Sequence, residues 1–483
     1  MHWKTTYPLA ASATLVLVTI AIANPPRYHM KKVPALGDGA SGGCCHMQAT
    51  GWNKDGTMVG FINRHADDGT FDRRGVLWRA GEEPVEFSHE TWAPANPFFV
   101  TDSGWIGGRG MPIDADECTL NRHIFVQPPD GEMVNLSEGI GCDEFVPEFI
   151  DMTEEGALLF TRADAQNQWA KNPFIMYPDG SLVALECGKG VDYSPVLCGA
   201  SADGSVIGAS IHGASFLRPG RWVDGSFELL LTPGPLTTWY PGATLGVGPD
   251  GSIVSTTFDL VSDKWRPTRW NREGEVDFLP VPSTMNDAGV QYLWDDLAVG
   301  WAFGDSPMPE LAIWHLEDDA VVQARFKEFP EGTDEFMGWV FGEPVHRAGD
   351  HVIAATINGD EYRGDLFVAP IDGGEVRFLH ELIVHADDES YFSAGPDLWS
   401  GIRSIFAHAE NDSFVVNKLV GDDVVAFILE RLRAGDVNGD HFVDGADIAD
   451  LLGAWGTDDR AADLDRNGIV DGADLSIAIG DWG

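Results

Sequence analysis

Short apolar segments joined by Asp-Gly turns recur between about residues 44 and 433, and they limit the possible folds more than any other feature of the chain. Residues 57–61 and 205–209 alternate apolar with other side chains, as a strand with one buried face does. An Asp-Gly pair between two such segments predicts a β-hairpin. The pairs are Asp55-Gly56, Asp130-Gly131, Asp179-Gly180, Asp203-Gly204, Asp250-Gly251 and Asp372-Gly373. The pattern predicts a mainly β domain.

A large aromatic residue recurs in this region at intervals of 44 to 60 residues. Units of about this length with four strands each predict the blades of a β-propeller, with the aromatic rings packed between blades. The eight positions are Trp78, Phe125, Tyr177, Trp222, Trp270, Trp314, Phe367 and Phe427. They favour eight blades, with seven as the alternative. The last unit shows three strand-like segments, and we expect residues 27–36 to supply the fourth and close the ring.

Two of these units resemble the extracellular repeat family of secreted bacterial proteins. The stretches TGWNKDGTMVG at 50–60 and ASADGSVIG at 200–208 carry the resemblance, and the first is followed by Val76-Leu77-Trp78. In that family a strand pair of this kind precedes a strand that carries tryptophan. The resemblance implies a propeller fold and says little about activity, because propellers host many functions.

The C-terminal fifty residues contain one motif twice. Residues 435–456 and 462–483 align at an offset of 27 with nine identities in 22 positions. Both copies place oxygen-bearing side chains at positions 1, 3, 5, 9 and 12 of a loop, which is the pattern of an EF-hand-like calcium site. The side chains are Asp436, Asn438, Asp440, Asp444 and Asp447 in the first copy and Asp463, Asp465, Asn467, Asp471 and Asp474 in the second. At position 7, Phe442 and Ile469 are expected to offer a backbone carbonyl.

The pair of loops resembles the type I dockerin, in which two loop–helix units bind two Ca²⁺ ions. The resemblance covers about 50 of the 483 residues and implies a small all-α domain that docks to a cohesin-like receptor. Dockerins usually belong to extracellular assemblies that degrade polysaccharides. The chain departs from that pattern at His441, which replaces the usual glycine at position 6, and at the Gly-Ala pairs 445–446 and 472–473. Trp455 and Trp482 are expected to pack the two halves together.

The N-terminus predicts export. Lys4 precedes an uncharged run at 9–23, and Ala21 and Ala23 suit cleavage before Asn24. The run is too short to cross a bilayer, so we expect a secreted protein without a transmembrane segment. Six cysteines fit an oxidising compartment, and Cys118–Cys142 and Cys187–Cys198 are the favoured pairs. The expected domains are a signal peptide at 1–23, a propeller at 24–433 and a calcium-binding domain at 434–483.

The net charge of −45 argues against nucleic acid as a partner. Segment 434–483 alone holds 12 Asp and two Arg. We find no catalytic motif, so catalytic residues stay unknown. The favoured hypothesis is a propeller that binds a glycan or a protein and is attached to an extracellular assembly through its C-terminal domain. The alternative is a dockerin-borne glycoside hydrolase or lyase, whose paired carboxylates the sequence cannot place.

Overall fold

The computed structural model describes residues 26–34, 45–65, 71–79, 82–87, 92–112, 123–136, 147–163, 171–186, 194–212, 217–231, 237–238, 246–259, 262–294, 296–304, 310–326, 341–356, 366–386, 402–408, 413–420 and 423–483. The chain divides into two compact units. One is Tyr28–Arg431, and the other combines the N-terminal residues up to Arg27 with Leu432–Gly483. The predicted signal peptide lies outside the described residues, as do Cys44, Cys118, Cys142 and Cys187.

The larger unit is built from mostly antiparallel sheets of four or five strands that follow one another along the chain. The first two are β2 (Cys45–Trp52) to β5 (Val85–Phe87) with β3 (Met58–His65) and β4 (Phe71–Trp78), and β6 (Trp92–Val100) to β9 (Val134–Asn135) with β7 (Ile106–Pro112) and β8 (His123–Gln127). The next two are β10 (Pro147–Met152), β11 (Leu158–Ala163), β12 (Lys171–Met176) and β13 (Leu182–Ala184), and then β14 (Ser194–Ala200), β15 (Val206–His212), β16 (Leu217–Val223) and β17 (Ser226–Leu229).

The fifth sheet starts with the short strands β18 (Thr237–Thr238) and β19 (Gly246–Val247), followed by β20 (Ile253–Asp259), β21 (Lys264–Trp270) and β22 (Val276–Phe278). The sixth holds β23 (Asp287–Leu293), β24 (Leu297–Phe303), β25 (Glu310–His315) and β26 (Ala320–Phe326), and the seventh β27 (Phe341–Ala348), β28 (His351–Thr356), β29 (Leu366–Pro370) and β30 (Gly374–Phe378). Parallel pairing of β26 with β30 joins these two sheets. The last sheet has β32 (Ile402–His408), β33 (Ser413–Val420) and β34 (Asp423–Leu432).

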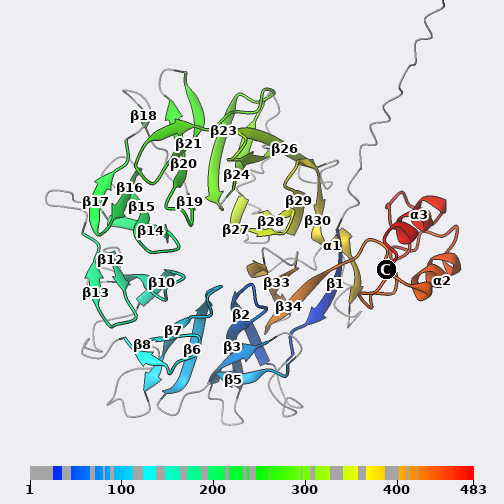
Figure 1. Cartoon of the computed structure of the whole chain (residues 1–483), viewed down its shortest axis with the longest axis horizontal. Coiled ribbons are helices and arrows are strands. Elements are labelled where there is room, and N and C mark those ends of the chain that lie inside the picture. Colours follow the sequence, from blue (N-terminus) through cyan, green and yellow to red (C-terminus); the bar gives the residue numbers. More distant parts are fainter. Residues whose placement is uncertain are drawn as a thin grey trace, which may run out of the picture. The chain divides into compact units, whose positions relative to one another are not determined.

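These sheets form a β-propeller of eight blades, counted over the described strands, as Figure 1 shows. Each blade packs on the next, for example through β4 and β6, β12 and β14, and β27 and β32. The ring closes where β2 of the first blade contacts β32 and β33 of the last. The mainly β propeller that the turn pattern and the aromatic period predict is therefore present.

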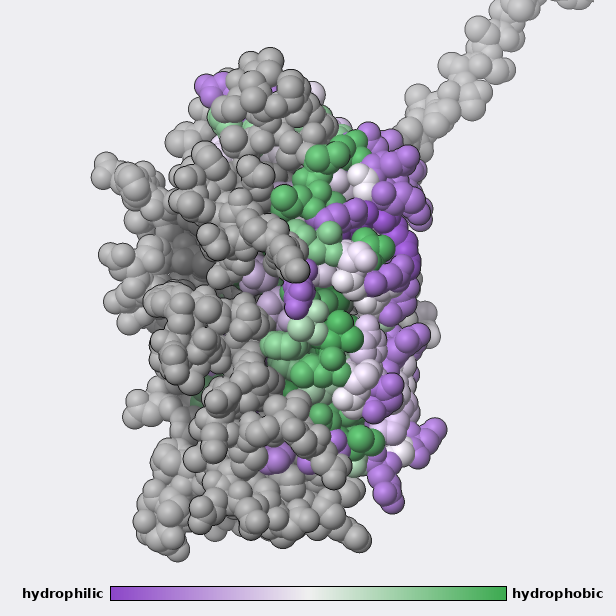
Figure 2. Space-filling view, turned by 90° about the vertical axis from the view of Figure 1, so that its left-hand side faces the viewer, coloured by the Kyte–Doolittle hydropathy of each residue, from purple (hydrophilic) through white to green (hydrophobic). Residues whose placement is uncertain are grey.

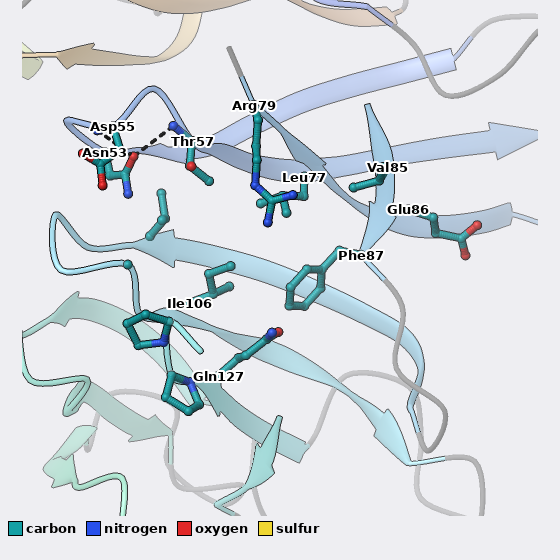
Figure 3. Close-up of a pocket in the computed structure, with 14 residues that line it drawn as sticks. Asn53, Asp55, Thr57, Leu77, Arg79, Val85, Glu86, Phe87, Ile106 and Gln127 are labelled. Carbon is teal, nitrogen blue, oxygen red and sulfur yellow. Dashed lines mark hydrogen bonds between the residues drawn. The ribbon is translucent and has the colours of Figure 1, made fainter. Parts of the chain in front are cut away.

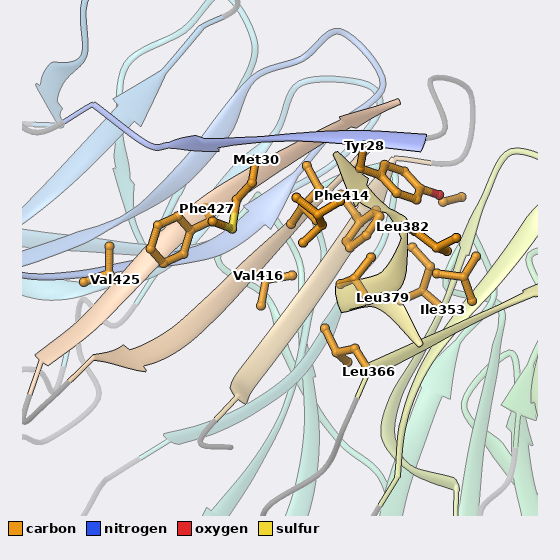
Figure 4. Packing of buried hydrophobic residues seen from close by; sticks show 14 residues of the cluster. Tyr28, Met30, Ile353, Leu366, Leu379, Leu382, Phe414, Val416, Val425 and Phe427 are labelled. Atoms are coloured by element: carbon orange, nitrogen blue, oxygen red, sulfur yellow. The ribbon is translucent and has the colours of Figure 1, made fainter. Parts of the chain in front are cut away.

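An N-terminal strand completes the last blade, as the sequence predicted. β1 (Arg27–Lys32) lies beside β34 and is flanked on its other edge by β31 (Ile383–Ala386), which follows the short helix α1 (Leu379–Leu382). Figure 4 shows Tyr28 and Met30 of this strand in the same apolar cluster as Phe414 and Phe427. The Tyr28 and Phe414 rings meet edge to face at 5.1 Å. Burial of these side chains stabilises the closure of the ring.

In four blades a recurring tryptophan connects its blade to the preceding one. The indole N–H of Trp222 donates to Glu186 O at 3.1 Å, and those of Trp270 and Trp314 donate to Leu231 O and Pro280 O at 2.6 Å. Each acceptor follows the outermost strand of the preceding blade. Trp78 in the first blade donates in the same way to Pro34 O, just after β1. By this bond β1 takes the place of the fourth strand of the last blade.

The predicted aromatic positions are buried in seven of eight units, and Tyr177 is the exception. Trp78, Phe125, Trp222, Trp270, Trp314, Phe367 and Phe427 all lie on the third strand of their blade. Tyr177 follows the end of β12 and is 36% exposed, so its assignment to the interface was wrong. In that blade Ile175 and Met176 fill the interface instead.

The Asp-Gly pairs close hairpins between first and second or third and fourth strands. In the turn from Asn53, the amide of Gly56 donates to Asn53 O at 3.0 Å, and Gly56 has a φ of 75°. Gly180, Gly204, Gly251 and Gly373 repeat both features. A left-handed φ after the turn is a conformation that glycine adopts without strain. These turns are also linked between blades, since Lys54 N donates to Asp102 Oδ1 and Ser103 N to Glu154 Oε2.

The outer strands of the third and fourth blades carry exposed apolar side chains. Figure 2 looks onto this side and shows a hydrophobic band beside a hydrophilic margin. Leu182 and Val183 on β13, Leu229 on β17 and Leu231 are all exposed. No helix in the described part of the chain combines the length and the apolarity that a bilayer crossing requires.

Candidate calcium-binding loops

The smaller unit contains two helices, α2 (Gly445–Gly453) and α3 (Gly472–Gly480), each preceded by one copy of the predicted loop. Position 12 of each loop falls on the third residue of its helix, at Asp447 and Asp474. Asp444 and Asp471, at position 9, cap the helices, and each forms a capping box with the position-12 carboxylate. The loop is thereby fixed to the first turn of its helix.

Each loop folds around two buried carboxylates, at positions 1 and 12. In the first loop, Asp436 and Asp447 are fully buried. Asp447 Oδ1 accepts from Val437 N at 2.8 Å and Asn438 N at 3.1 Å, and its Oδ2 accepts from Asp444 N at 2.8 Å. Asp436 accepts from Gly439 N at 2.7 Å and His441 N at 2.9 Å. Backbone amides thus surround both acids, and such charge-assisted bonds are strong.

The second loop repeats this arrangement 27 residues later. Asp474 Oδ1 accepts from Leu464 N at 2.7 Å and Asp465 N at 3.1 Å, and Asp463 accepts from Asn467 N and Gly468 N. Among the described residues, Asp463, Asp465 and Asp474 bring carboxylate oxygens within 4.8 Å of one another. Burial raises the pKa of the Asp465 carboxyl, and the charges of Asp474 and Asp463 raise it further.

Other predicted ligands accept hydrogen bonds from backbone amides two residues further on, and these bonds hold the loop backbone in short turns. Asn438 Oδ1 accepts from Asp440 N, and Asp440 Oδ1 accepts from Phe442 N, at 3.0 and 2.9 Å. Asn467 Oδ1 accepts from Ile469 N in the second loop at 2.9 Å. Asp465, Asp444 and Asp471 also lie in these loops, at positions 3 and 9. Phe442 and Ile469 point their side chains to solvent, so only their backbone can face the loop interior.

The replacement of glycine at position 6 leaves the loop path unchanged. His441 takes a φ of 71°, and Gly468 at the same position has a φ of 91°. At position 4 the first loop has the glycine, Gly439 with a φ of 78°, and the second loop has Arg466 with a φ of 58°. Each loop therefore holds one non-glycine residue in the left-handed region, which costs on the order of 1 kcal/mol.

The two halves pack on a small core and pair through backbone bonds. Val437, Leu451, Ala462, Leu464, Val470 and Ala478 form the core. Gly456 N donates to Val470 O at 2.9 Å, and Gly483 N donates to Val443 O at 3.4 Å, so the bonds repeat at the same offset. Trp455 and Trp482, which were expected to pack the halves together, are 48% and 54% exposed, and the Trp482 ring lies beside Gly445 of the first copy.

Arg27 also belongs to this unit and is buried in it. Its Nη1 donates to Ala434 O at 3.0 Å and to Asp436 O at 2.8 Å, and its Nη2 donates to Ala461 O. The guanidinium thus bridges the segments that lead into the two loops. Burial lowers the pKa of Arg27 to about 10, against the opposing charges of Asp436 and Asp447. Sequence reasoning missed this residue because it lies more than 400 positions away.

The donor set fits a hard divalent cation. Both loops supply only oxygen ligands, and they bury two carboxylates each in a small volume. Like charges held close together inside a protein repel strongly unless a cation or protons neutralise them. Ca²⁺ takes six to eight oxygens from flexible loops of this kind.

The propeller carries a pocket between its first two blades, with a volume of about 360 Å³. Figure 3 shows Asn53 and Thr57 on one side and Ile106 and Gln127 on the other. Asn53 accepts from Asp55 N and Thr57 N, while its Nδ2 donates to Thr101 O in the second blade. The two acidic residues on its lining, Asp55 and Glu86, come from opposite parts of the first blade, and Glu86 pairs with Arg74 at 2.9 Å.

No protein-family model matches the sequence, and no curated protein matches it either. Solved structures that resemble it include TolB from Acinetobacter baumannii, at a TM-score of 0.32 and 14% identity over 66% of this chain and 81% of that one. The β-propeller domain of the Trilobed protease from Pyrococcus furiosus gives a TM-score of 0.36 and 12% identity over 70% and 98%. Oligopeptidase B from Trypanosoma brucei gives 0.40 and 11% over 69% of this chain and 48% of that one, so this chain spans about half of the peptidase. Likenesses this low bear on neither the activity nor the ligands of the chain.

Proposed function

We propose that this chain is a secreted propeller protein that attaches to an extracellular assembly through its C-terminal unit. The unit would act as a type I dockerin-like module that docks to a cohesin-like receptor in the presence of calcium. The assembly would be of the kind that degrades polysaccharides, and the propeller would present a surface for a glycan or a protein. The observation that carries the proposal is the duplicated loop, in which buried aspartates at positions 1 and 12 organise the backbone in both copies.

Two Ca²⁺ ions would occupy the loops. Side-chain oxygens of positions 1, 3, 5, 9 and 12 and the carbonyls of Phe442 and Ile469 would hold them. Bound calcium would neutralise the carboxylates that now rely on backbone amides. The ion would therefore stabilise the unit, because the unfolded chain offers no preformed site.

A duplicated apolar surface supports docking to a protein. Trp455 and Trp482 are exposed at equivalent positions, and so are Leu452 and Ile479 near the ends of the two helices. Exposed apolar groups of this size are costly on a small unit, and in soluble proteins they mark interaction sites. Aromatic side chains in particular dominate the energy of protein interfaces.

Calcium titration by calorimetry on the mature chain tests the first half of the proposal. We expect two binding events, one of which is lost in Asp447→Asn and the other in Asp474→Asn. The control is Asp450→Asn, which removes the same charge from an exposed position of α2. Absence of binding in the unsubstituted chain, or equal loss in the control, would refute a role for these loops.

Receptor binding tests the second half. A panel of immobilised cohesin domains is exposed to the mature chain in calcium and in EDTA, and retention in calcium alone is expected. The pair Trp455→Ala and Trp482→Ala should abolish retention while calcium binding persists. Leu231→Ala, an equally drastic change at an exposed apolar position of the propeller, should have no effect. Calcium binding without retention by any cohesin would leave a calcium module and remove the dockerin assignment.

A further inference from the structure

The second blade lacks the tryptophan that links four other blades to the blade before them. In the fifth blade this residue is Trp270, which pairs with Ile253, the first residue of β20. The first residue of β7 in the second blade is Ile106, and its partner on β8 is Gln127. Phe125, the buried aromatic residue of the second blade, lies two positions earlier on the same strand. A glutamine therefore stands where the repeat has an indole in other blades.

The pocket between the first two blades lies at the place of the missing indole. Its volume of about 360 Å³ falls in the range of about 300–1,000 Å³ that is typical of ligand sites. Gln127 and Ile106 both line it. Three further lining residues hold the same places in their strands and turns as residues that pack around Trp270: Phe87 corresponds to Leu230, Val100 to Val247 and Thr57 to Val206. The pocket thus has the walls of a tryptophan site without its tryptophan.

Polar groups on the lining of this pocket are not bonded to other protein groups. Within the described part of the chain, neither the Gln127 amide nor the Thr57 hydroxyl makes a hydrogen bond. Arg79 lies 3.8 Å from Glu82, which is too far for a hydrogen bond, and its side chain is 53% exposed. Figure 3 shows the side chains of Arg79, Phe87 and Gln127 pointing towards the space between the two blades. An incoming group could therefore bind to them without breaking a bond inside the protein.

We propose that this pocket binds the indole ring of a tryptophan on another polypeptide. The ring would lie between Phe87 and Ile106, as Trp270 lies between Leu230 and Ile253 in the fifth blade. Its N–H would donate to Gln127 Oε1, in place of the backbone carbonyl that accepts from the tryptophan in other blades. The Arg79 guanidinium would cover the exposed face of the ring, because cations are attracted to aromatic faces.

The rim of the pocket favours a polypeptide over a free indole compound. β5 is the last strand in the order of its sheet, and Val85 on this strand lines the pocket and is 46% exposed. An extended segment could pair along β5 while one of its side chains enters the pocket. This deepens the proposed function, on which it rests only for the idea that the propeller presents a surface to a ligand. The site itself is derived from the first two blades alone.

Fluorine NMR with N-acetyl-5-fluorotryptophan amide and the mature chain tests the site, because the 17 tryptophans of the chain give no signal of their own. N-acetyl-4-fluorophenylalanine amide is the matched probe, since it keeps an aromatic ring and lacks the N–H donor. We expect the tryptophan probe to bind at least about threefold more tightly, from the additional hydrogen bond to Gln127. Equal affinities, or no binding of the tryptophan probe, would overturn the proposal.

Gln127→Trp restores the residue of the other blades and should fill the pocket. Probe binding should weaken at least about tenfold, because a ring attached to the chain competes at a high effective concentration. The melting temperature should rise as the space is filled. Leu182→Trp is the control, since it adds a tryptophan at an exposed position of β13 and should change neither property. Undiminished binding in Gln127→Trp would refute the site, and so would a lower melting temperature or a failure to fold, because the pocket would then not fit an indole.

A peptide of sequence Ala-Ala-Trp-Ala-Ala separates a polypeptide from a free indole compound. In competition with the fluorinated probe it should bind at least about threefold more tightly than N-acetyltryptophan amide, through backbone contacts along β5. Hydrogen exchange of the unsubstituted chain should slow in β5 when the peptide is bound. Equal affinity, or unchanged exchange in β5, would overturn the assignment to a polypeptide. None of these results depends on cohesin binding, so this inference and the proposed function can fail separately.

Discussion

The two units of this protein repeat a motif, but their repeats are stabilised by different physics. In the propeller the repeated element is an aromatic residue on the third strand, which is buried between blades and, where it is tryptophan, also bonds to the preceding blade. In the C-terminal unit the repeated element is a carboxylate, and the core consists of six buried aliphatic residues with four partly buried ones packed against them. Apolar burial stabilises at any calcium concentration, whereas a cluster of acids depends on its counter-ion. If the loops bind calcium as proposed, one chain holds a repeat that needs no ion and a repeat that depends on one.

Calcium removal should separate the two units most clearly. In EDTA we expect the C-terminal unit to lose its structure, because calcium at a thousand times its Kd would contribute about 4 kcal/mol per site. The propeller should keep its melting transition. Hydrogen exchange of the mature chain with and without calcium measures both units at once. Equal protection of α2 and α3 in both conditions would show that the loops need no ion.

Removal of an interface tryptophan should affect the propeller alone. Trp222→Ala is expected to lower the free energy of unfolding by about 3–5 kcal/mol, through lost burial and the lost bond to Glu186 O. Tyr177→Ala, at the predicted position that is exposed, should cost less than about 0.5 kcal/mol. Denaturant unfolding monitored in the propeller tests the pair. Similar costs for both would contradict the burial seen here.

Trp222 and Tyr177 illustrate which parts of the structure could be predicted from the sequence and which could not. Asp-Gly turns and aromatic spacing predicted the strands, the blade plan and closure by β1, because those signals are local and repeated. The exposure of Tyr177 could not be predicted, because Ile175 and Met176, one or two residues earlier, are also apolar and are the residues buried at the interface in this blade. The partial exposure of Trp455 and Trp482 could not be predicted, because large aromatic side chains are usually expected in a core.

The polar link that closes the ring should matter less than the tryptophans. The buried side chain of Asn417 donates to Ala49 O at 2.7 Å and accepts from Ala49 N at 3.0 Å, which joins the last blade to the first. Asn417→Ala leaves both groups of Ala49 without these bonds and should cost about 2–3 kcal/mol. Thermal unfolding should show the loss with and without calcium. A loss of stability that appears only in EDTA would mean that closure of the ring is not independent of calcium.

Acid should weaken the propeller through His346. Burial lowers the pKa of His346 to about 4, below the usual value of 6.5. The unfolded chain therefore binds this proton between pH 6.5 and 4 while the folded chain does not, so stability falls as the pH drops through that window. At pH 5 the expected loss is about 1–2 kcal/mol. His346→Gln should flatten this part of the stability–pH curve, and an unchanged slope would exclude the residue as its source.

The smallest expected effect concerns position 6 of the first loop in the C-terminal unit. His441→Gly removes the left-handed strain at position 6 and should stabilise the first loop by about 0.5 kcal/mol after the added freedom of the unfolded chain is subtracted. The calcium affinity of the first site should rise about twofold, and that of the second should not change. Calorimetry on the mature chain measures both sites. A weaker first site would show that the imidazole contributes to the loop.

The bonds of Arg27 affect both the folding of the C-terminal unit and its transfer to other proteins. The acceptors Ala434 O, Asp436 O and Ala461 O are synthesised more than 400 residues after Arg27. The C-terminal unit therefore cannot be completed until the intervening propeller has been synthesised. Genetic transfer of residues 432–483 to another protein would carry three buried carbonyls without their donor. Residues 432–483 are therefore not a self-contained module, and their transfer to another protein also requires the segment that carries Arg27.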